Sequence, residues 1–246
     1  NGGFLNQRTL EWGSDDPHEE DVLFFGSSTC YSGIDPHALE TFGLTGFNFC
    51  SSSQAISHSE CFIQTALVES QPQLVVLDVY PAMWGTDAIG LECTRDWIIN
   101  SNLRSPIWKK TMLSMAVQTG DLFAVFSALY YNTIRPIKAA GSNPFLFKDQ
   151  MGAYRGKGFV GRLFPSIDRI ACETLEVKMT DYECGHIRNI QSLCSANSAE
   201  LILVNPPQLC EESFDIPVCF EGISFIDGND WPGSKTPQNF YDDHHL

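Results

Sequence analysis

A serine near the start of the chain and a histidine near its end are the residues whose types and spacing could do chemistry. Ser28 follows an unbroken apolar run at 22–25 that stops at a glycine. Asp242 and His245 lie three residues apart in the last segment. A serine hydroxyl becomes a nucleophile when a histidine takes its proton and a carboxylate orients that histidine. These residues predict a catalytic triad of Ser28, His245 and Asp242, with Ser28 as the nucleophile.

The surroundings of Ser28 also favour a nucleophile. A short apolar run ended by glycine is typical of a buried strand in a parallel sheet. The loop after such a strand lies at its carboxyl end, where open α/β sheets bind their ligands. Asp35 and Pro36 then predict a helix start, because Asp caps helices and Pro suits the first helical position. Taken alone, the same stretch also fits an ordinary Gly-Ser turn.

The order of these motifs resembles the SGNH (GDSL-type) hydrolase superfamily. The first block of that family is Gly-Asp-Ser, and Gly26-Ser27-Ser28 stands in its place. A serine in the middle position resembles a bacterial branch linked to the acylation of surface polysaccharides. That branch runs Phe-x-Gly-Ser-Ser, Asp-Pro, then Asn with a serine-rich turn, and this chain matches at 24–28, 35–36 and 48–54. The resemblance covers residues 20–80 and 199–246.

The resemblance implies donors for the oxyanion that forms when Ser28 attacks. The second block of the family supplies a backbone N–H from a glycine, and Ser53 occupies the matching place after Asn48. The third block usually reads Gly-x-Asn-Asp, but residues 77–82 contain no asparagine. The Tyr80 hydroxyl and the Asn48 side chain are the expected substitutes, and Tyr80 also fits a simple buried aromatic. This departure favours the transferase-like branch, in which the third block varies.

The segment 242–245 has a second interpretation as a metal site. Carboxylates and imidazoles suit zinc or manganese. Adjacent residues rarely converge on one ion, so the triad is preferred and no cofactor is expected.

The elements that must position these residues alternate between strand and helix. Apolar runs predict strands at 22–25, 46–50, 74–80, 199–207 and 223–227, and helical spacing predicts helices at 36–42, 56–70 and 185–196. Such alternation implies a parallel sheet with right-handed crossovers. We expect an α/β fold, a flavodoxin-like three-layer sandwich whose five parallel strands have the order 2-1-3-4-5.

The alternation breaks between about 82 and 183. Residues 107–131 look helical and apolar, 141–161 are rich in glycine, and three basic side chains lie within 155–162. A structureless loop of this length inside a domain is improbable. We therefore expect one domain over 1–246 with a partly helical insertion, which either caps the site or forms a second packed layer.

Composition limits the functions that this chain can have. The 246 residues are 43% hydrophobic and 18% charged, as in a globular protein. The net charge of -15 argues against a nucleic-acid partner and against docking on an anionic membrane. No apolar run reaches the roughly 18 residues of a spanning helix. None of the nine cysteines forms a C-x-x-C pair, and those from Cys172 to Cys219 are candidates for disulfides.

Two functions from different classes remain open. The first is a serine-dependent acyl-ester hydrolase or O-acyltransferase, which acts on an acylated carbohydrate or small ester through an acyl-enzyme on Ser28. The second is a catalytically silent SGNH-like carbohydrate-binding module, suggested by the missing asparagine and the aromatic-rich insertion. The resemblance implies an extracytoplasmic or cell-envelope location, and a reduced cytoplasmic setting stays open, as does the oligomeric state.

Overall fold

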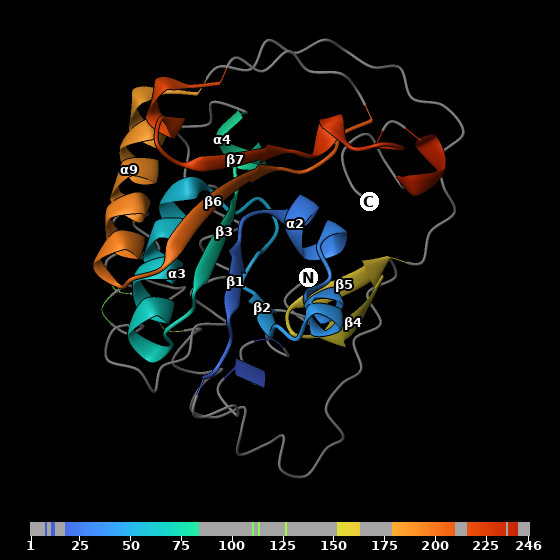
Figure 1. Ribbon diagram of the computed structural model, residues 1–246, viewed down its shortest axis with the longest axis horizontal. Helices are drawn as coiled ribbons and strands as arrows, with labels where there is room; N and C mark the ends of the chain where they lie inside the picture. Colours follow the sequence, from blue (N-terminus) through green and yellow to red (C-terminus); the bar gives the residue numbers. More distant parts are fainter. Residues whose placement is uncertain are drawn as a thin grey trace.

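The computed structural model describes residues 8, 11–12, 18–83, 110, 113, 126, 152–162, 179–209, 216–234 and 236–240. The first part of the chain forms β1 (Val22–Phe25), α2 (Ser28–Gly33), η1 (Pro36–Phe42), β2 (Gly46–Asn48), α3 (Ile56–Glu69), β3 (Leu74–Asp78) and α4 (Tyr80–Met83). The later part forms β4 (Gly152–Gly156), β5 (Phe159–Arg162), α9 (Asp181–Ala196), β6 (Glu200–Asn205), η2 (Val218–Phe220), β7 (Ser224–Asp227), η3 (Gly228–Asp230) and η4 (Pro237–Asn239) (Figure 1).

Strands β2, β1, β3, β6 and β7 lie side by side in this order, and every pair is parallel. The predicted α/β fold and the strand order 2-1-3-4-5 are therefore confirmed. β1 is buried along its whole length because it lies inside the sheet with both faces covered. The carboxyl ends of these strands all lie at one edge of the sheet. Ser28 lies at this edge, three residues after the end of β1.

The two faces of the sheet bury different side chains, because successive strand residues point to opposite faces. One face packs on α3 and α9, which lie side by side (Figure 1). Its strand residues include Leu23, Phe25, Val75, Leu77, Leu201 and Leu203. The other face packs on α2 and the hairpin β4–β5, and its core includes Val22, Phe24, Val76, Val204, Cys30, Tyr31 and Val160. A sheet covered on both faces agrees with the expected sandwich.

Helix α9 is longer than its sequence prediction of 185–196. It begins at Asp181 because Thr180 and Glu183 form a capping box, in which each side chain bonds the other residue's backbone N–H. A disulfide between Cys184 and Cys219 joins this helix to η2. Both cysteines lie in the range from which a disulfide was expected.

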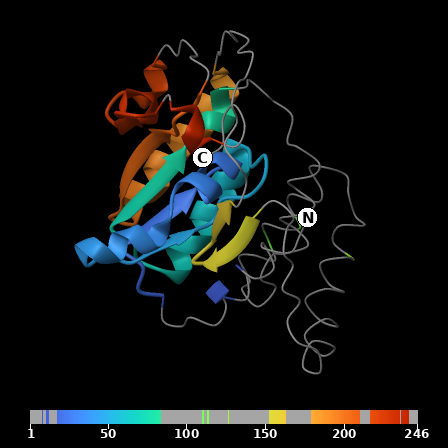
Figure 2. The ribbon, with the colours of Figure 1, turned by 90° about the vertical axis from the view of Figure 1, so that its right-hand side faces the viewer.

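Within the expected insertion, residues 152–162 form a β-hairpin, which the sequence did not predict. Strands β4 and β5 pair antiparallel, and their turn lies against β2, where the Asn48 N–H donates to the Lys157 carbonyl at 2.9 Å. Gly158 allows this approach: its φ is +78°, and a Cβ there would lie 1.9 Å from the Asn48 carbonyl oxygen. The hairpin turn is thereby joined to the end of the edge strand β2, and the hairpin (yellow in Figure 2) packs with β5 against α2. The helical prediction for 107–131 lies almost wholly outside the described residues.

Candidate active site

Ser28 is the first residue of α2 and follows β1 after a two-residue turn. It is partly exposed, while Ser27 and Thr29 on either side are buried. The prediction that helical structure begins only near Asp35 is wrong. Residues 28–33 carry no apolar periodicity, so they form a helix because the fold buries four of them, Thr29, Cys30, Tyr31 and Ser32. Asp35 does cap η1, where it accepts a hydrogen bond from the His37 N–H.

Asp78 lies at the centre of the hydrogen bonds that fix this turn. It ends β3 beside β1 and is completely buried. Its Oδ2 accepts hydrogen bonds from the Ser27 N–H at 3.0 Å, the Ser27 hydroxyl at 2.9 Å and the Thr29 hydroxyl at 2.8 Å. Its Oδ1 accepts one from the Tyr80 N–H at 2.8 Å. Burial raises the pKa of Asp78, and the bonds from Ser27, Thr29 and Tyr80 oppose that rise.

Gly26 makes the close approach of Asp78 possible. A Cβ on this glycine would lie 2.3 Å from the Asp78 Cβ and 2.8 Å from its Oδ2. The Gly26 φ of +150° is also one that side chains rarely adopt. The glycine of the first motif block is therefore required by the strand β3 carboxylate as well as by the turn.

Asn48 is completely buried, and its side chain is engaged with backbone atoms. Its Oδ1 accepts from the Cys50 N–H at 2.8 Å, and its Nδ2 donates to the carbonyls of Cys30 at 3.4 Å and Ile34 at 3.5 Å. Asn48 therefore joins the end of β2 to α2. A contact between Asn48 and substrate stays a prediction.

Ser53 has a backbone conformation that is unusual for a residue with a side chain. It is exposed and its φ is +52°, in the left-handed region that favours glycine. The turn at 51–53 is bonded to the segment around Ser28. The Ser51 N–H donates to the Gly26 carbonyl at 3.1 Å, and Ser52 Oγ lies 3.2 Å from the Tyr31 hydroxyl. Donation from the Ser53 N–H to an oxyanion stays a prediction.

Tyr80 begins α4 directly beyond the end of β3, and its side chain is buried. A buried aromatic was one of its two sequence interpretations. The role of its hydroxyl as an oxyanion donor stays a prediction.

Asp242 and His245 lie outside the described residues, as does the metal alternative at 242–245. The segment that leads to them starts at the carboxyl end of β7 and is held there by polar contacts. Asp227 Oδ1 accepts hydrogen bonds from Asn205 Nδ2 at 3.0 Å and from the Asn229 N–H at 3.0 Å. Phe240, two residues before Asp242, is buried.

The basic side chains of the hairpin differ in their surroundings. Lys157 Nζ lies 4.0 Å from Glu40 on η1, whereas Arg155 is exposed. The turn between the strands also involves Glu11, whose carboxylate accepts from the Lys157 N–H and from the Tyr154 hydroxyl.

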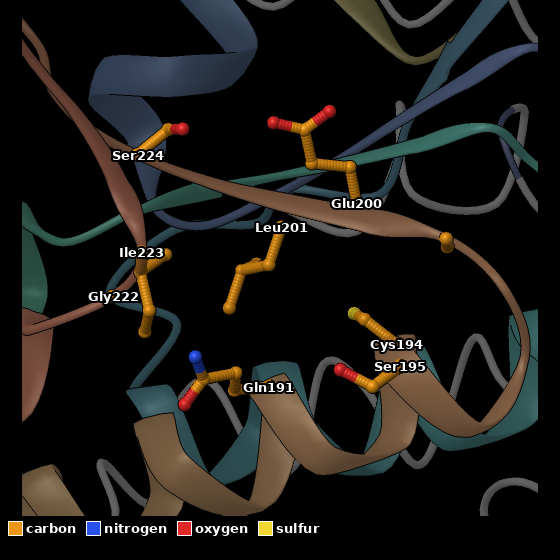
Figure 3. Close-up of a pocket in the computed structure, with 9 residues that line it drawn as sticks. Gln191, Cys194, Ser195, Glu200, Leu201, Gly222, Ile223 and Ser224 are labelled. Carbon is orange, nitrogen blue, oxygen red and sulfur yellow. The ribbon is translucent and has the colours of Figure 1, made fainter.

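A cavity of about 180 Å³ lies on the other side of the molecule from this site. It is bounded by α9 and by the amino ends of β6 and β7, where Leu201 points toward the helix (Figure 3). Because the strands are parallel, this is the edge opposite to the one that carries Ser28. The described part of the chain holds no group of three metal-ligating side chains and no helix able to cross a membrane.

Asp78 is the site residue that the sequence analysis missed. Asp78 lies within 77–82, the segment in which the family pattern predicts an asparagine. The available signal was an ionisable residue that ends an otherwise apolar, buried strand, since buried charge is costly and needs hydrogen-bond partners.

No protein-family model and no curated protein matches the chain. Among solved structures, the chain is similar to the crystal structure of a candidate acylhydrolase from Bacteroides fragilis NCTC 9343. The TM-score is 0.42 and the sequence identity 13%, over 98% of this chain and 88% of that one. A likeness this distant says nothing by itself about activity.

Proposed function

We propose that the protein is a serine-dependent acyl-ester enzyme of the SGNH type, either an esterase or an O-acyltransferase. One observation carries the proposal. Ser28 is partly exposed at the carboxyl end of β1, between two buried residues that hydrogen-bond to the same buried carboxylate. A rigidly held, accessible serine at this edge of a parallel sheet is what nucleophilic catalysis requires.

The proposed reaction has two steps. Ser28 Oγ attacks the ester carbonyl carbon while His245 takes the hydroxyl proton, and Asp242 orients the imidazole. The tetrahedral intermediate collapses, the C–O bond to the alcohol breaks, and the alcohol leaves with the proton from His245. Water or a sugar hydroxyl then gives its proton to His245 and attacks the acyl carbon. The second intermediate collapses as the bond between the acyl carbon and Ser28 Oγ breaks, and His245 returns the proton to Ser28 Oγ.

The proposed substrate is an acylated carbohydrate in an extracytoplasmic setting, as the resemblance implies. The disulfide between Cys184 and Cys219 supports this location, because disulfides persist in oxidising compartments.

A fluorophosphonate probe tests the nucleophile. Such a probe phosphonylates an activated serine, and we expect one adduct on the wild-type protein, mapped by peptide mass spectrometry to Ser28. Ser28→Ala should abolish labelling. Ser195→Ala, a change of the same kind at an exposed serine of α9 near the opposite edge of the sheet, should leave it intact. If the folded wild-type protein is not labelled, the proposal is wrong.

The proposed base is tested by p-nitrophenyl acetate turnover. His245→Ala should lower kcat by about 10⁴-fold or more, because the members of a triad act as one unit. His244→Ala serves as the matched control next to it and should retain turnover. Equal turnover in both variants would remove His245 from the mechanism.

One observation favours the second candidate function, a catalytically silent carbohydrate-binding module. Trp231 follows η3 at the carboxyl edge of the sheet and is 52% exposed. An exposed indole ring offers a large flat surface with a polar N–H, which suits a ligand that is part apolar and part polar. Retention on an acetylated-polysaccharide gel that is lost in Trp231→Ala, without any probe labelling, would support this function.

A further inference from the structure

Asp78 is a buried ionisable group that the triad does not use. Its four hydrogen-bond donors are two backbone N–H groups and two hydroxyls, and none of these donors is charged. Burying a carboxylate with neutral partners is costly, and an apolar residue of similar size often stabilises a protein more. Stability alone therefore does not account for an aspartate at this position.

The bonds of Asp78 reach both neighbours of the candidate nucleophile. Ser27 is held through its N–H and its hydroxyl, and Thr29 through its hydroxyl. The two hydroxyls also lie 2.7 Å apart, so the three oxygen atoms form a closed triangle. With the residues before and after it fixed to one atom, Ser28 has little freedom in the direction of its Cα–Cβ bond.

The Asp78 carboxylate is held rigidly because its backbone belongs to the central sheet. Asp78 comes from β3, and the register of β1 and β3 pairs Phe25 with Leu77, so Asp78 lies level with Gly26. Its other oxygen is bonded by the Tyr80 N–H at the start of α4. The carboxylate that holds Ser27 and Thr29 is therefore fixed at both of its oxygens and belongs to the central sheet.

We propose that Asp78 is a positioning residue for Ser28, which fixes Ser27 and Thr29 so that Ser28 Oγ is presented to the substrate in the reactive orientation. This inference rests on the proposed function of Ser28. A misplacement of about 1 Å at a reacting group can cost about 10²-fold in rate. Asp78 therefore acts on the rate of the covalent step and not on the binding of substrate.

The test measures fluorophosphonate labelling at several probe concentrations, which separates the maximal labelling rate from the half-saturating concentration. In Asp78→Ala, which loses all four bonds, we expect the maximal rate to fall by about 10²-fold with little change in half-saturation. Asp78→Asn keeps one carbonyl oxygen for Ser27 and Thr29, and we expect it to recover most of the rate. A structural role alone would not produce this split or this recovery.

A second pair of variants keeps the test decisive if Asp78→Ala does not fold. Thr29→Val removes the hydrogen bond from the Thr29 hydroxyl to Asp78 and keeps the shape of the side chain. Thr65→Val is the control: it makes the same change in α3, where the buried hydroxyl donates to the Cys61 carbonyl at 2.8 Å. We expect the labelling rate to fall several-fold in Thr29→Val and to stay unchanged in Thr65→Val.

The outcomes separate the two claims. Wild-type rates in both Asp78→Asn and Thr29→Val, together with a wild-type rate in any folded Asp78→Ala, overturn the positioning role and leave the proposed function standing. Equal losses in Thr29→Val and Thr65→Val also overturn it, because general destabilisation then explains the effect. A folded wild-type protein without any labelling overturns the proposed function, and the inference fails with it.

Discussion

At the scale of single residues, Gly26 lies so close to Asp78 of β3 that there is no room for a Cβ on residue 26. The missing side chain lets Asp78 reach the turn, and the turn then holds its buried hydroxyls in hydrogen bonds. The identity of residue 26 is therefore tied to a residue on another strand.

Gly26→Ala should test this dependence. The new Cβ would lie 2.3 Å from the Asp78 Cβ, so we expect a loss of about 1–3 kcal/mol in unfolding free energy and a slower labelling of Ser28. Gly43→Ala is the control, because its φ is also positive, at +73°, but nothing lies within 4 Å of the added atom. It should cost about 1 kcal/mol from the backbone alone and leave labelling unchanged. Urea unfolding and the probe assay measure both effects.

His58 should make the protein sensitive to acid. Burial in α3 and, as the smaller cause, the charge of His186 together lower its pKa to about 4. A histidine that is harder to protonate when folded stabilises the protein above the unfolded pKa of about 6.5, and this stability is lost as the pH falls toward 4. We expect this group to account for a loss of about 2–3 kcal/mol between pH 7 and pH 4.5.

The measurement is urea unfolding of the wild-type protein and His58→Gln at both pH values. The loss on acidification should be smaller in the variant by about the same 2–3 kcal/mol. Identical losses in the two proteins would show that His58 does not set the acid limit.

At the scale of elements, the site is assembled by pieces with very little regular structure of their own. α2 is six residues long, and the turn at 51–53 and the hairpin β4–β5 brace it from two sides. α9 is the opposite case, a 16-residue helix with a capping box. The stability of α9 can therefore be raised by a local substitution, whereas the stability of α2 depends on the elements packed around it.

Gly185→Ala should stabilise the protein. Gly185 lies in the interior of α9, is exposed, and has nothing within 4 Å of an added Cβ. Alanine is better than glycine in a helix by about 0.5–1 kcal/mol. Gly222→Ala, where φ is +78° and the space is equally open, should lower stability instead. Thermal unfolding of the two variants gives the comparison, and a change of the same sign in both would contradict the prediction.

At the scale of the whole molecule, the disulfide limits how far the unfolded chain can expand. Cys184 and Cys219 are 35 residues apart in sequence. In the chain-entropy description, closing a loop of this length stabilises the folded state by about 3–4 kcal/mol.

The double variant Cys184→Ser, Cys219→Ser should lose stability by that amount in urea unfolding without reductant. Wild-type protein treated with dithiothreitol should unfold at the same urea concentration as the double variant. If reduction leaves the wild-type midpoint unchanged, this disulfide does not contribute to stability.

The sequence by itself determined the main strands, their parallel arrangement and the position of Ser28 at a strand end. These features depend on local signals, namely apolar runs such as 22–25 and 74–78 and the turn residues that follow them. The strand boundaries agree with the structure to within about two residues, since β3 ends at Asp78 where the prediction ran to Tyr80.

Tertiary structure alone decided how the site is held. The bond between Ser27 and Asp78 joins residues 51 positions apart, and it exists only because β1 and β3 pair in one register. The same holds for the burial of Asn48, the start of α2 at Ser28 and the pairing of Cys184 with Cys219. Each depends on which groups the fold buries against one another, and a buried polar group takes whatever partner the packing brings within reach.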